Sequence, residues 1–210
     1  MKFGSKLPSA FHLLTLSETW LNSDILDAKI DISGYQLFRR DRGSNGGGLA
    51  VFVRNDLKVL RRYDLESSEI EGLWLEVFLP KNRSFLVGTF YRPPSSSNYA
   101  VKEFMSVFES KLQFASENFN ELILVGDLNC DLLKRGTVSS ECKQLRALLK
   151  AEQLAQLIKQ PTLITKDSST LLDVILTNSP HNIRDSGVVS LNFSDHEFIY
   201  CIRKINFRRA

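Results

Sequence analysis

The sequence predicts a mixed α/β fold, and three observations support this. Apolar runs with the alternation typical of β-strands dominate the first half of the chain. Two segments with apolar residues at helical spacing interrupt the strands, and further strand-like runs follow in the last fifth of the chain. Because strands and helices do not alternate strictly, we expect many hairpin connections rather than a purely parallel sheet.

The length of 210 residues, with no linker-like stretch, indicates a single domain over residues 1–210. The 43% of apolar residues suffice for a buried core, and the net charge of +3 permits contact with a polyanion without requiring it. Three cysteines without a CxxC spacing indicate a reducing compartment and argue against a zinc site or a disulfide framework. With no signal peptide and no apolar stretch of membrane-spanning length, we expect an intracellular protein, nuclear or cytoplasmic, that does not bind a membrane.

The strands of the first half are separated by clear turn signals. An apolar run at 13–16 comes first, and a glycine-rich polar loop at 41–48 precedes the run 49–53. In the run 49–53, both the odd-numbered and the even-numbered residues are apolar, as expected of a strand that is covered on both faces. Residues 72–79 and 85–91 lie on either side of a short turn, so we expect them to form a hairpin.

Two helices are expected in the second half. Ser97 or Asn98 can cap the first, in which apolar residues recur at helical spacing from 101 to 115. Ser139 or Ser140 can cap the second, whose apolar inner side extends from 142 to 149. Strands are then expected at 171–177, 187–192 and 197–205.

Acidic, amide and imidazole side chains close or interrupt four of the apolar runs. They are Glu18, Asp127 with Asn129, Asp173, and Asp195 with His196. One such cluster at a strand end is ordinary, whereas four suggest strand ends that converge on a site for a hard metal ion and a phosphate ester. Mg²⁺ needs only one or two protein carboxylates beside water and phosphate oxygens, so few protein ligands would suffice.

Asp127 and Asn129 lie on the same side of the chain if the strand persists through them. A carboxylate beside an amide can accept a proton from water and hold that water in place. Gly126, just before them, allows a turn or the close approach of a ligand. The alternative is that the strand leaves the core through an Asx turn.

His196 stands beside the carboxylate of Asp195 and is the histidine best placed to donate a proton or hydrogen bond near neutral pH. Asp173 interrupts an otherwise apolar strand, and a buried carboxylate needs a partner because an unpaired buried charge is costly. His196 is the candidate partner. The alternative is that the Asp173 carboxylate accepts a hydrogen bond from nearby backbone or from Thr177.

Tyr91 ends its strand, and its hydroxyl could bond a phosphate oxygen, with Arg92 adding positive charge. The alternative is a tyrosine at the edge of the core. Glu18 ends the run 13–16, where a lone glutamate is usually a surface residue. Glu18 becomes a candidate site residue only because other carboxylates also lie at strand ends.

Five motifs together resemble the endonuclease/exonuclease/phosphatase superfamily, in residue type, order and spacing. They are Glu18-Thr19-Trp20, Tyr91-Arg92-Pro93-Pro94, Gly126-Asp127-Leu128-Asn129, Asp173 within Leu-Asp-Val-Ile-Leu-Thr-Asn, and Ser194-Asp195-His196. The likeness is closest to the endonuclease domains of non-LTR retrotransposons of the jockey and chicken-repeat type. The segments 46–53 and 176–178 are typical of that subgroup.

The resemblance implies a four-layered α/β sandwich of two packed, mixed and mainly antiparallel sheets flanked by helices. It implies hydrolysis of a phosphodiester with Mg²⁺, or alternatively Mn²⁺, and here the nicking of DNA. DNA is therefore the expected partner, and the arginine-rich segments 39–42 and 61–62 are expected to follow its backbone. The alternative is that these segments are ordinary solvated surface. The resemblance also leaves room for a reverse transcriptase domain in a longer polyprotein.

Roles for single residues follow from the same resemblance. Glu18 and Asp195 are similar to the metal-side carboxylates of the family. Asp127 resembles the residue that activates the attacking water, and Asn129 its orienting partner.

The resemblance further implies that His196, held by Asp173, stabilises charge on the phosphate and that Tyr91 bonds a phosphate oxygen. Thr162 or Thr165 is expected to contact the DNA backbone.

One departure from the family is visible in the sequence. Family members open with a strand that carries a metal-placing asparagine, but residues 1–11 contain no asparagine. We therefore expect an N-terminally truncated domain that lacks the first strand. This leaves two alternatives open beside DNA nicking: an inactive remnant or non-catalytic nucleic-acid-binding domain, and a phosphatase of the same superfamily.

Overall fold

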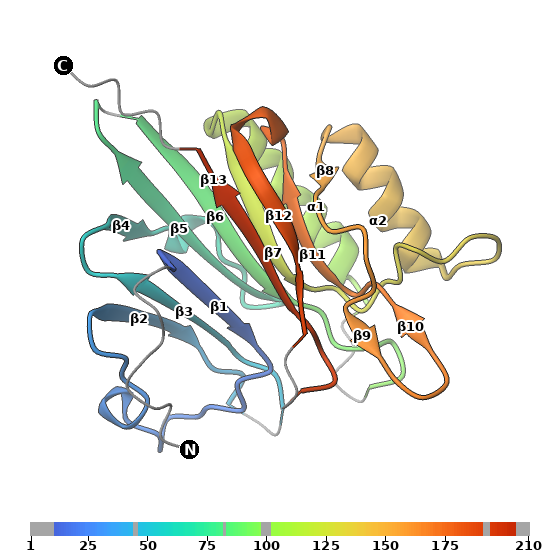
Figure 1. Ribbon diagram of the computed structural model, residues 1–210, viewed down its shortest axis with the longest axis horizontal. Coiled ribbons are helices and arrows are strands. Elements are labelled where there is room, and N and C mark those ends of the chain that lie inside the picture. Colours follow the sequence, from blue (N-terminus) through green and yellow to red (C-terminus); the bar gives the residue numbers. More distant parts are fainter. Residues whose placement is uncertain (1–10, 44–45, 82, 98–101, 191–193, 205–210) are drawn as a thin grey trace.

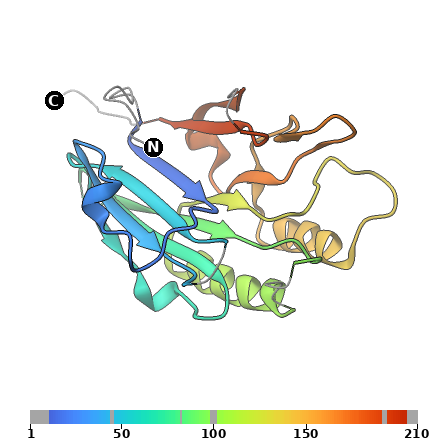
Figure 2. The same ribbon diagram turned by 90° about the horizontal axis from the view of Figure 1, so that it is seen from below.

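The computed structural model describes residues 11–43, 46–81, 83–97, 102–190 and 194–204. A large sheet lies at its centre, with two helices on one face and smaller sheets on the other (Figures 1 and 2). This arrangement confirms the expected mixed α/β fold of packed sheets and helices. Within the described residues, no helix combines the length and apolar character needed to cross a membrane.

The large sheet has six strands in the order β4-β5-β6-β7-β11-β8. Neighbours are antiparallel except for β6 and β7, which run parallel because the helix α1 (Phe104–Asn118) connects them. The strands are β4 (Lys58–Arg61), β5 (Glu71–Leu79), β6 (Arg83–Tyr91), β7 (Leu122–Asp127), β8 (Ala155–Gln156) and β11 (Asp173–Thr177). The hairpin predicted from 72–79 and 85–91 is confirmed as β5 and β6.

The second layer contains two separate antiparallel sheets. One has the order β1-β3-β2, and the other pairs β12 with β13. The strands are β1 (Leu13–Ser17), β2 (Tyr35–Arg40), β3 (Leu49–Arg54), β12 (Ile183–Val189) and β13 (Phe198–Arg203). Both sheets pack on the face of the large sheet opposite the helices (Figure 2). Among the described strands, β1 pairs with β3 alone and β13 with β12 alone.

Two core clusters hold these layers together. The larger lies between the large sheet and the helices α1 (Phe104–Asn118) and α2 (Ser140–Ala151) and includes Trp74 of β5. The smaller lies between the large sheet and β3 and includes Leu73 and Leu75 of β5. Leu73, Trp74 and Leu75 alternate between the two clusters, as a strand that is covered on both faces requires.

The helix starts test two predicted caps. Ser139 caps α2, because its hydroxyl accepts a hydrogen bond from the Cys142 N–H at 3.2 Å. The prediction for α1 is wrong for Ser97, since the helix begins at Phe104 with Glu103 as its N-cap and no side-chain capping bond. The other candidate, Asn98, lies outside the described residues.

Short elements complete the chain. A hairpin of β9 (Leu163–Ile164) and β10 (Ser169–Thr170) projects beside β11, and three 3₁₀ turns lie at Asp27–Lys29, Tyr63–Leu65 and Pro180–Asn182. The strand expected at 187–192 is β12, which begins earlier, and residues 191–192 lie outside the described residues. The strand expected at 197–205 is β13, and residue 205 is likewise not described.

Candidate active site

Three polar residues lie abreast on adjacent strands at one end of the large sheet. Tyr91 of β6 is opposite Asp127 of β7, and Asp127 is opposite Asp173 of β11. The parallel strands β6 and β7 end together, and the antiparallel strand β11 begins at the same edge. Sheet register therefore brings together side chains that are up to 82 positions apart in the sequence.

Asp127 and Asn129 form a tight turn just beyond β7. One carboxylate oxygen of Asp127 accepts the Asn129 backbone N–H at 2.8 Å, and the other accepts the Asn129 side-chain amide at 3.2 Å. The Asx turn considered from the sequence is therefore present, and the same carboxylate also faces the cluster. Gly126 is required here because a Cβ atom would lie 1.9 Å from the carbonyl oxygen of Phe90.

Asp173 and His196 are hydrogen-bonded, as the sequence predicts, with 2.8 Å between Oδ2 and Nδ1. The backbone N–H of Asp173 donates to the Thr162 hydroxyl at 3.0 Å. His196 is fixed from the other side by a bridge to Leu163 of β9. The imidazole is thus oriented by a carboxylate on one strand and by backbone pairing with another.

The electrostatics of the cluster follow from burial and from like charges. Burial, followed by the nearby charge of Asp173, raises the pKa of Asp127 to about 7, against the opposing effect of the Asn129 hydrogen bond. The hydrogen bond to Asp173 raises the pKa of His196 to about 9, so the imidazole is protonated at neutral pH. Burial, followed by the hydrogen bond to Glu18, raises the pKa of Tyr91.

Glu18 joins the cluster from the second layer. It directly follows β1, and one of its carboxylate oxygens accepts the hydroxyl hydrogen of Tyr91. Its φ of 52° is in the left-handed region, which residues with a side chain adopt infrequently, and such strain concentrates at functional sites. Tyr91 is 3% exposed, so it is both a core-edge tyrosine and a partner of Glu18.

Asp195 lies at the surface beside His196. Its charge contributes to the raised pKa of His196, and its backbone carbonyl accepts the Ile164 N–H at 3.4 Å. Among the described residues, no side chain forms a hydrogen bond or ion pair with its carboxylate. The structure thus places Asp195 next to the cluster without linking it to Glu18.

The carboxylates of the cluster suit a hard divalent cation, whereas the protonated imidazole of His196 has no lone pair to offer a metal. Ligand atoms of Asp127, Asp173 and His196 lie within 4.8 Å of one another, and Glu18 reaches the same end of the sheet through Tyr91. The carboxylates of Asp127 and Asp173 repel each other in a partly buried region, and the pKa of Asp127 is raised to about 7. A cation with oxygen ligands, such as Mg²⁺, would relieve this repulsion.

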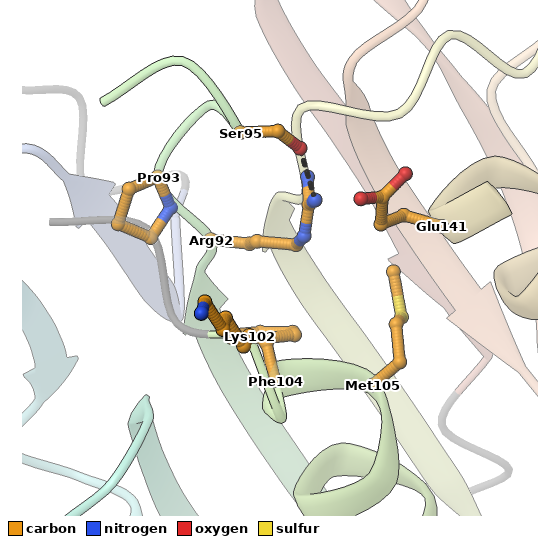
Figure 3. Close-up of a pocket in the computed structure, with 7 residues that line it drawn as sticks. All are labelled: Arg92, Pro93, Ser95, Lys102, Phe104, Met105 and Glu141. Carbon is orange, nitrogen blue, oxygen red and sulfur yellow. Dashed lines mark hydrogen bonds between the residues drawn. The ribbon is translucent and has the colours of Figure 1, made fainter. Parts of the chain in front are cut away.

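Arg92 has a role that the sequence did not reveal. Its side chain is 5% exposed and donates to the backbone carbonyls of Leu128 at 3.1 Å and Asn129 at 3.4 Å. The Asn129 amide in turn donates to the Arg92 carbonyl at 2.8 Å. A second guanidinium nitrogen donates to Ser95, beside a small pocket at the start of α1 and α2 (Figure 3). Arg92 therefore supports the turn after Asp127 rather than facing a phosphate.

The two threonines proposed as DNA contacts have structural partners. Thr162 is fully buried, and its hydroxyl accepts the backbone N–H groups of Leu172 and Asp173. The Thr165 hydroxyl lies 2.8 Å from that of Ser168 within the turn between β9 and β10. The structure therefore does not support Thr162 as a contact of the DNA backbone, because its hydroxyl already orients β11.

The arginines of segments 39–42 and 61–62 are neutralised within the protein, and their side chains are between 14% and 24% exposed. The pairs are Arg39 with Asp27 and Asp41, Arg40 and Arg61 with Glu66, Arg42 with Glu71, and Arg62 with Asp64 and Glu76. These pairs connect strands and turns of the two layers. The expectation that both segments follow a DNA backbone is not supported, because their charge is already compensated.

Known structures share this fold. The endonuclease domain of TRAS1, a telomere-specific non-LTR retrotransposon, is 18% identical with a TM-score of 0.65, over 84% of this chain and 83% of that one. A 3′ phosphatase from Neisseria, NExo, bound to a product DNA hairpin is 14% identical with a TM-score of 0.69, over 92% and 89%. The catalytic domain of APE2 from Xenopus laevis is 14% identical with a TM-score of 0.63, over 95% and 86%.

No curated protein sequence matches the chain. Residues 85–200, which include most of β6, all of β7 and β11, and the Asp195-His196 pair, match the sequence model of the family described as endonuclease-reverse transcriptase. This segment is more than half of the 210 residues, and it contains most of the polar cluster at the end of the large sheet. The chain therefore belongs to the endonuclease-reverse transcriptase family, within the endonuclease/exonuclease/phosphatase superfamily.

Proposed function

We propose that this protein is a metal-dependent phosphodiesterase that nicks DNA in the manner of a retrotransposon-type endonuclease. The observation that carries the proposal is the row of Tyr91, Asp127 and Asp173 on adjacent strands, with His196 and Glu18 bonded to its two ends. Together these five residues supply a base, a protonated imidazole and further carboxylates at one end of the sheet.

Asp127 is the proposed general base. Its raised pKa of about 7 is close to the pH at which the enzyme would act, which is the optimum for a group that must be ionised and still accept a proton. Its two oxygens are held by the backbone and side-chain N–H groups of Asn129. Asn129 thus fixes the direction of the carboxylate toward an attacking water.

His196 is the proposed stabiliser of charge on the phosphate. Its pKa of about 9 keeps it protonated at neutral pH, and Asp173 holds the ring through Nδ1. The Nε2–H remains to donate to a phosphate oxygen as negative charge develops there. The Tyr91 hydroxyl, which now donates to Glu18, is the second proposed donor to the phosphate.

Glu18 and Asp195 are the proposed ligands of Mg²⁺, with Mn²⁺ as the alternative. Bound there, the ion would neutralise phosphate charge and favour ionised water. The charges of Asp173 and Glu18 both raise the pKa of Asp127, and this repulsion supports a cation in the region.

The choice of DNA over a small phosphate ester rests on the family match and on the likeness to a retrotransposon endonuclease. DNA as substrate also fits action in the nucleus, and a reverse transcriptase domain on the same polyprotein is the expected functional companion. A phosphatase is the second candidate, because a structure with the same fold is described as a 3′ phosphatase.

The test is the nicking of supercoiled plasmid with Mg²⁺, Mn²⁺ or EDTA, beside the hydrolysis of soluble phosphomonoesters. We expect metal-dependent nicking that Asp127→Ala and His196→Ala each lower by about 100-fold or more. The exposed residues Asp167 and His181, each changed to alanine, are the matched controls and should leave the rate unchanged.

Three outcomes separate the alternatives. Hydrolysis of phosphomonoesters without nicking would assign the site to a phosphatase. Neither activity, together with no Mg²⁺ uptake by calorimetry, would assign the chain to the non-catalytic class. Nicking that survives Asp127→Ala would contradict the proposed base.

A further inference from the structure

Trp20 is the aromatic side chain whose position calls for an explanation. The chain has two tryptophans: Trp74 is 1% exposed in the core, whereas Trp20 is 63% exposed. Trp20 also has a φ of 56°, in the left-handed region that bulky residues rarely adopt. It follows the Glu18 carboxylate by two positions, so their Cα atoms are at most about 7 Å apart.

Trp20 is held in place by the glycine-rich loop before β3. Its backbone N–H donates to the carbonyl of Gly47 at 2.9 Å, and the N–H of Thr19 donates to Gly48 at 3.3 Å. The indole lies against Gly46, where an added Cβ would be 3.7 Å from the ring. The exposed ring is therefore attached to a folded support rather than to a free end.

That support is itself anchored to the large sheet. Glu71 of β5 accepts the N–H of Gly48 at 2.5 Å and also binds the guanidinium of Arg42. Arg42 fills the space beside Gly47, where a Cβ atom would lie 2.3 Å from its guanidinium carbon. Three consecutive glycines with positive φ thus allow Arg42 and the indole to pack on the same backbone.

We propose that Trp20 is a stacking site for a nucleobase of the DNA strand that is cut, next to the nucleotide whose phosphate lies at Asp127 and His196. The inference rests on the proposed function and adds the contact that would hold an unstacked base. A large, rigid and exposed ring two residues after Glu18 suits a base, because every base has an aromatic face. The strained backbone at Glu18 and Trp20 is consistent with selection for the position of both side chains.

The two tryptophans provide a reporter that does not depend on activity. A base stacked on Trp20 should quench its fluorescence, while Trp74 is buried and should be unaffected. The wild-type chain is titrated, in EDTA and at constant salt, with a thymidine ten-mer and with a ten-mer of abasic sugar phosphates. We expect quenching by the thymidine oligomer and little quenching by the abasic one.

Two variants test the role of the ring. Trp20→Ala should weaken binding of a labelled thymidine oligomer by about 5- to 100-fold in anisotropy measurements, and should leave binding of the abasic oligomer nearly unchanged. Trp20→Phe should keep most of the affinity for the thymidine oligomer. The remaining Trp74 fluorescence reports whether either variant is folded.

The outcomes distinguish this inference from the proposed function. Equal weakening for both oligomers, or binding of the thymidine oligomer without quenching, would overturn the stacking site even if the protein nicks plasmid. Base-dependent quenching without any nicking would support the stacking site and contradict the proposed nuclease activity. Failure to bind either oligomer would overturn the stacking site. A protein that is a dimer in solution, and a monomer after Trp20→Ala, would show that the ring mediates self-association instead.

Discussion

Asp127→Asn should stabilise the folded protein at pH 8 in the absence of divalent metal. Folding raises the pKa of Asp127 from 3.8 to about 7, mainly through burial. The folded state therefore binds its proton more tightly than the unfolded chain, and stability contributed by this group is lost as the pH rises from 3.8 through 7. Above pH 7 the ionised carboxylate is a net cost to folding, which asparagine removes.

The magnitude follows from the two pKa values and the local hydrogen bonds. A difference of about three pKa units corresponds to about 4 kcal/mol. Asparagine loses one acceptor, because its amide group cannot accept the Asn129 side-chain N–H that now lies 3.2 Å from Asp127, at a cost of about 1 kcal/mol. The net gain at pH 8 is about 2–3 kcal/mol, or roughly 4–12 °C in Tm for a chain of this size. At pH 5 the electrostatic part falls to about 1.5 kcal/mol, so the gain nearly vanishes.

The assay is urea unfolding of wild type and variant at pH 5 and pH 8, in EDTA and in Mg²⁺. Asp24→Asn is the matched control, since Asp24 is exposed and should show no difference at either pH. Mg²⁺ should reduce the advantage of the variant, because a cation at the site favours the ionised carboxylate of the wild type. Destabilisation of Asp127→Asn by the same amount at both pH values would refute the reasoning.

Two further predictions concern the neighbours of Asp127. Asp173→Asn should lower the pKa of His196 from about 9 toward 6.5, as followed by NMR of the imidazole, and should move the alkaline limit of nicking to lower pH. In the wild type this pair stabilises the fold fully below pH 6.5, and that stability is lost as the pH rises through about 9, so urea unfolding at pH 6 and pH 10 should differ less in the variant. Gly126→Ala should destabilise the fold by more than about 3 kcal/mol, because its Cβ would meet a backbone carbonyl at 1.9 Å. Gly187→Ala, whose Cβ would meet the ring of Tyr200 at 3.1 Å, should cost less than half as much, and equal costs would contradict the packing argument.

Local patterns in the sequence determined much of the fold. The alternation in residues 72–79 and 85–91 correctly predicts β5 and β6, because the period of a strand depends on neighbouring residues alone. Ser139 correctly predicts the start of α2 for the same reason, since a cap acts over three residues. The pairing of Asp173 with His196 was also predicted from the sequence, because a buried carboxylate requires a partner.

The start of α1 was not predictable from its capping residues. Ser97 offered a good cap, yet the helix begins at Phe104, where the side chain enters the core cluster. Burial of a large aromatic residue outweighs a cap that contributes about 1 kcal/mol. The arginine segments were misjudged for a related reason, because several of their acidic partners, such as Glu71 and Glu76, come from another strand.

The sequence by itself determined the family, since the types and order of its polar residues identify it, and it named the residues that are proposed to carry the chemistry. Only the tertiary structure decided where those residues lie and which groups they contact. Tyr91 reaches Glu18 across 73 positions, and the raised pKa of Asp127 comes from burial and from the charge of Asp173 on the adjacent strand. Strand register and burial are properties of the packed sheets, and no local sequence pattern specifies the distance between two charges that meet only when the sheets assemble.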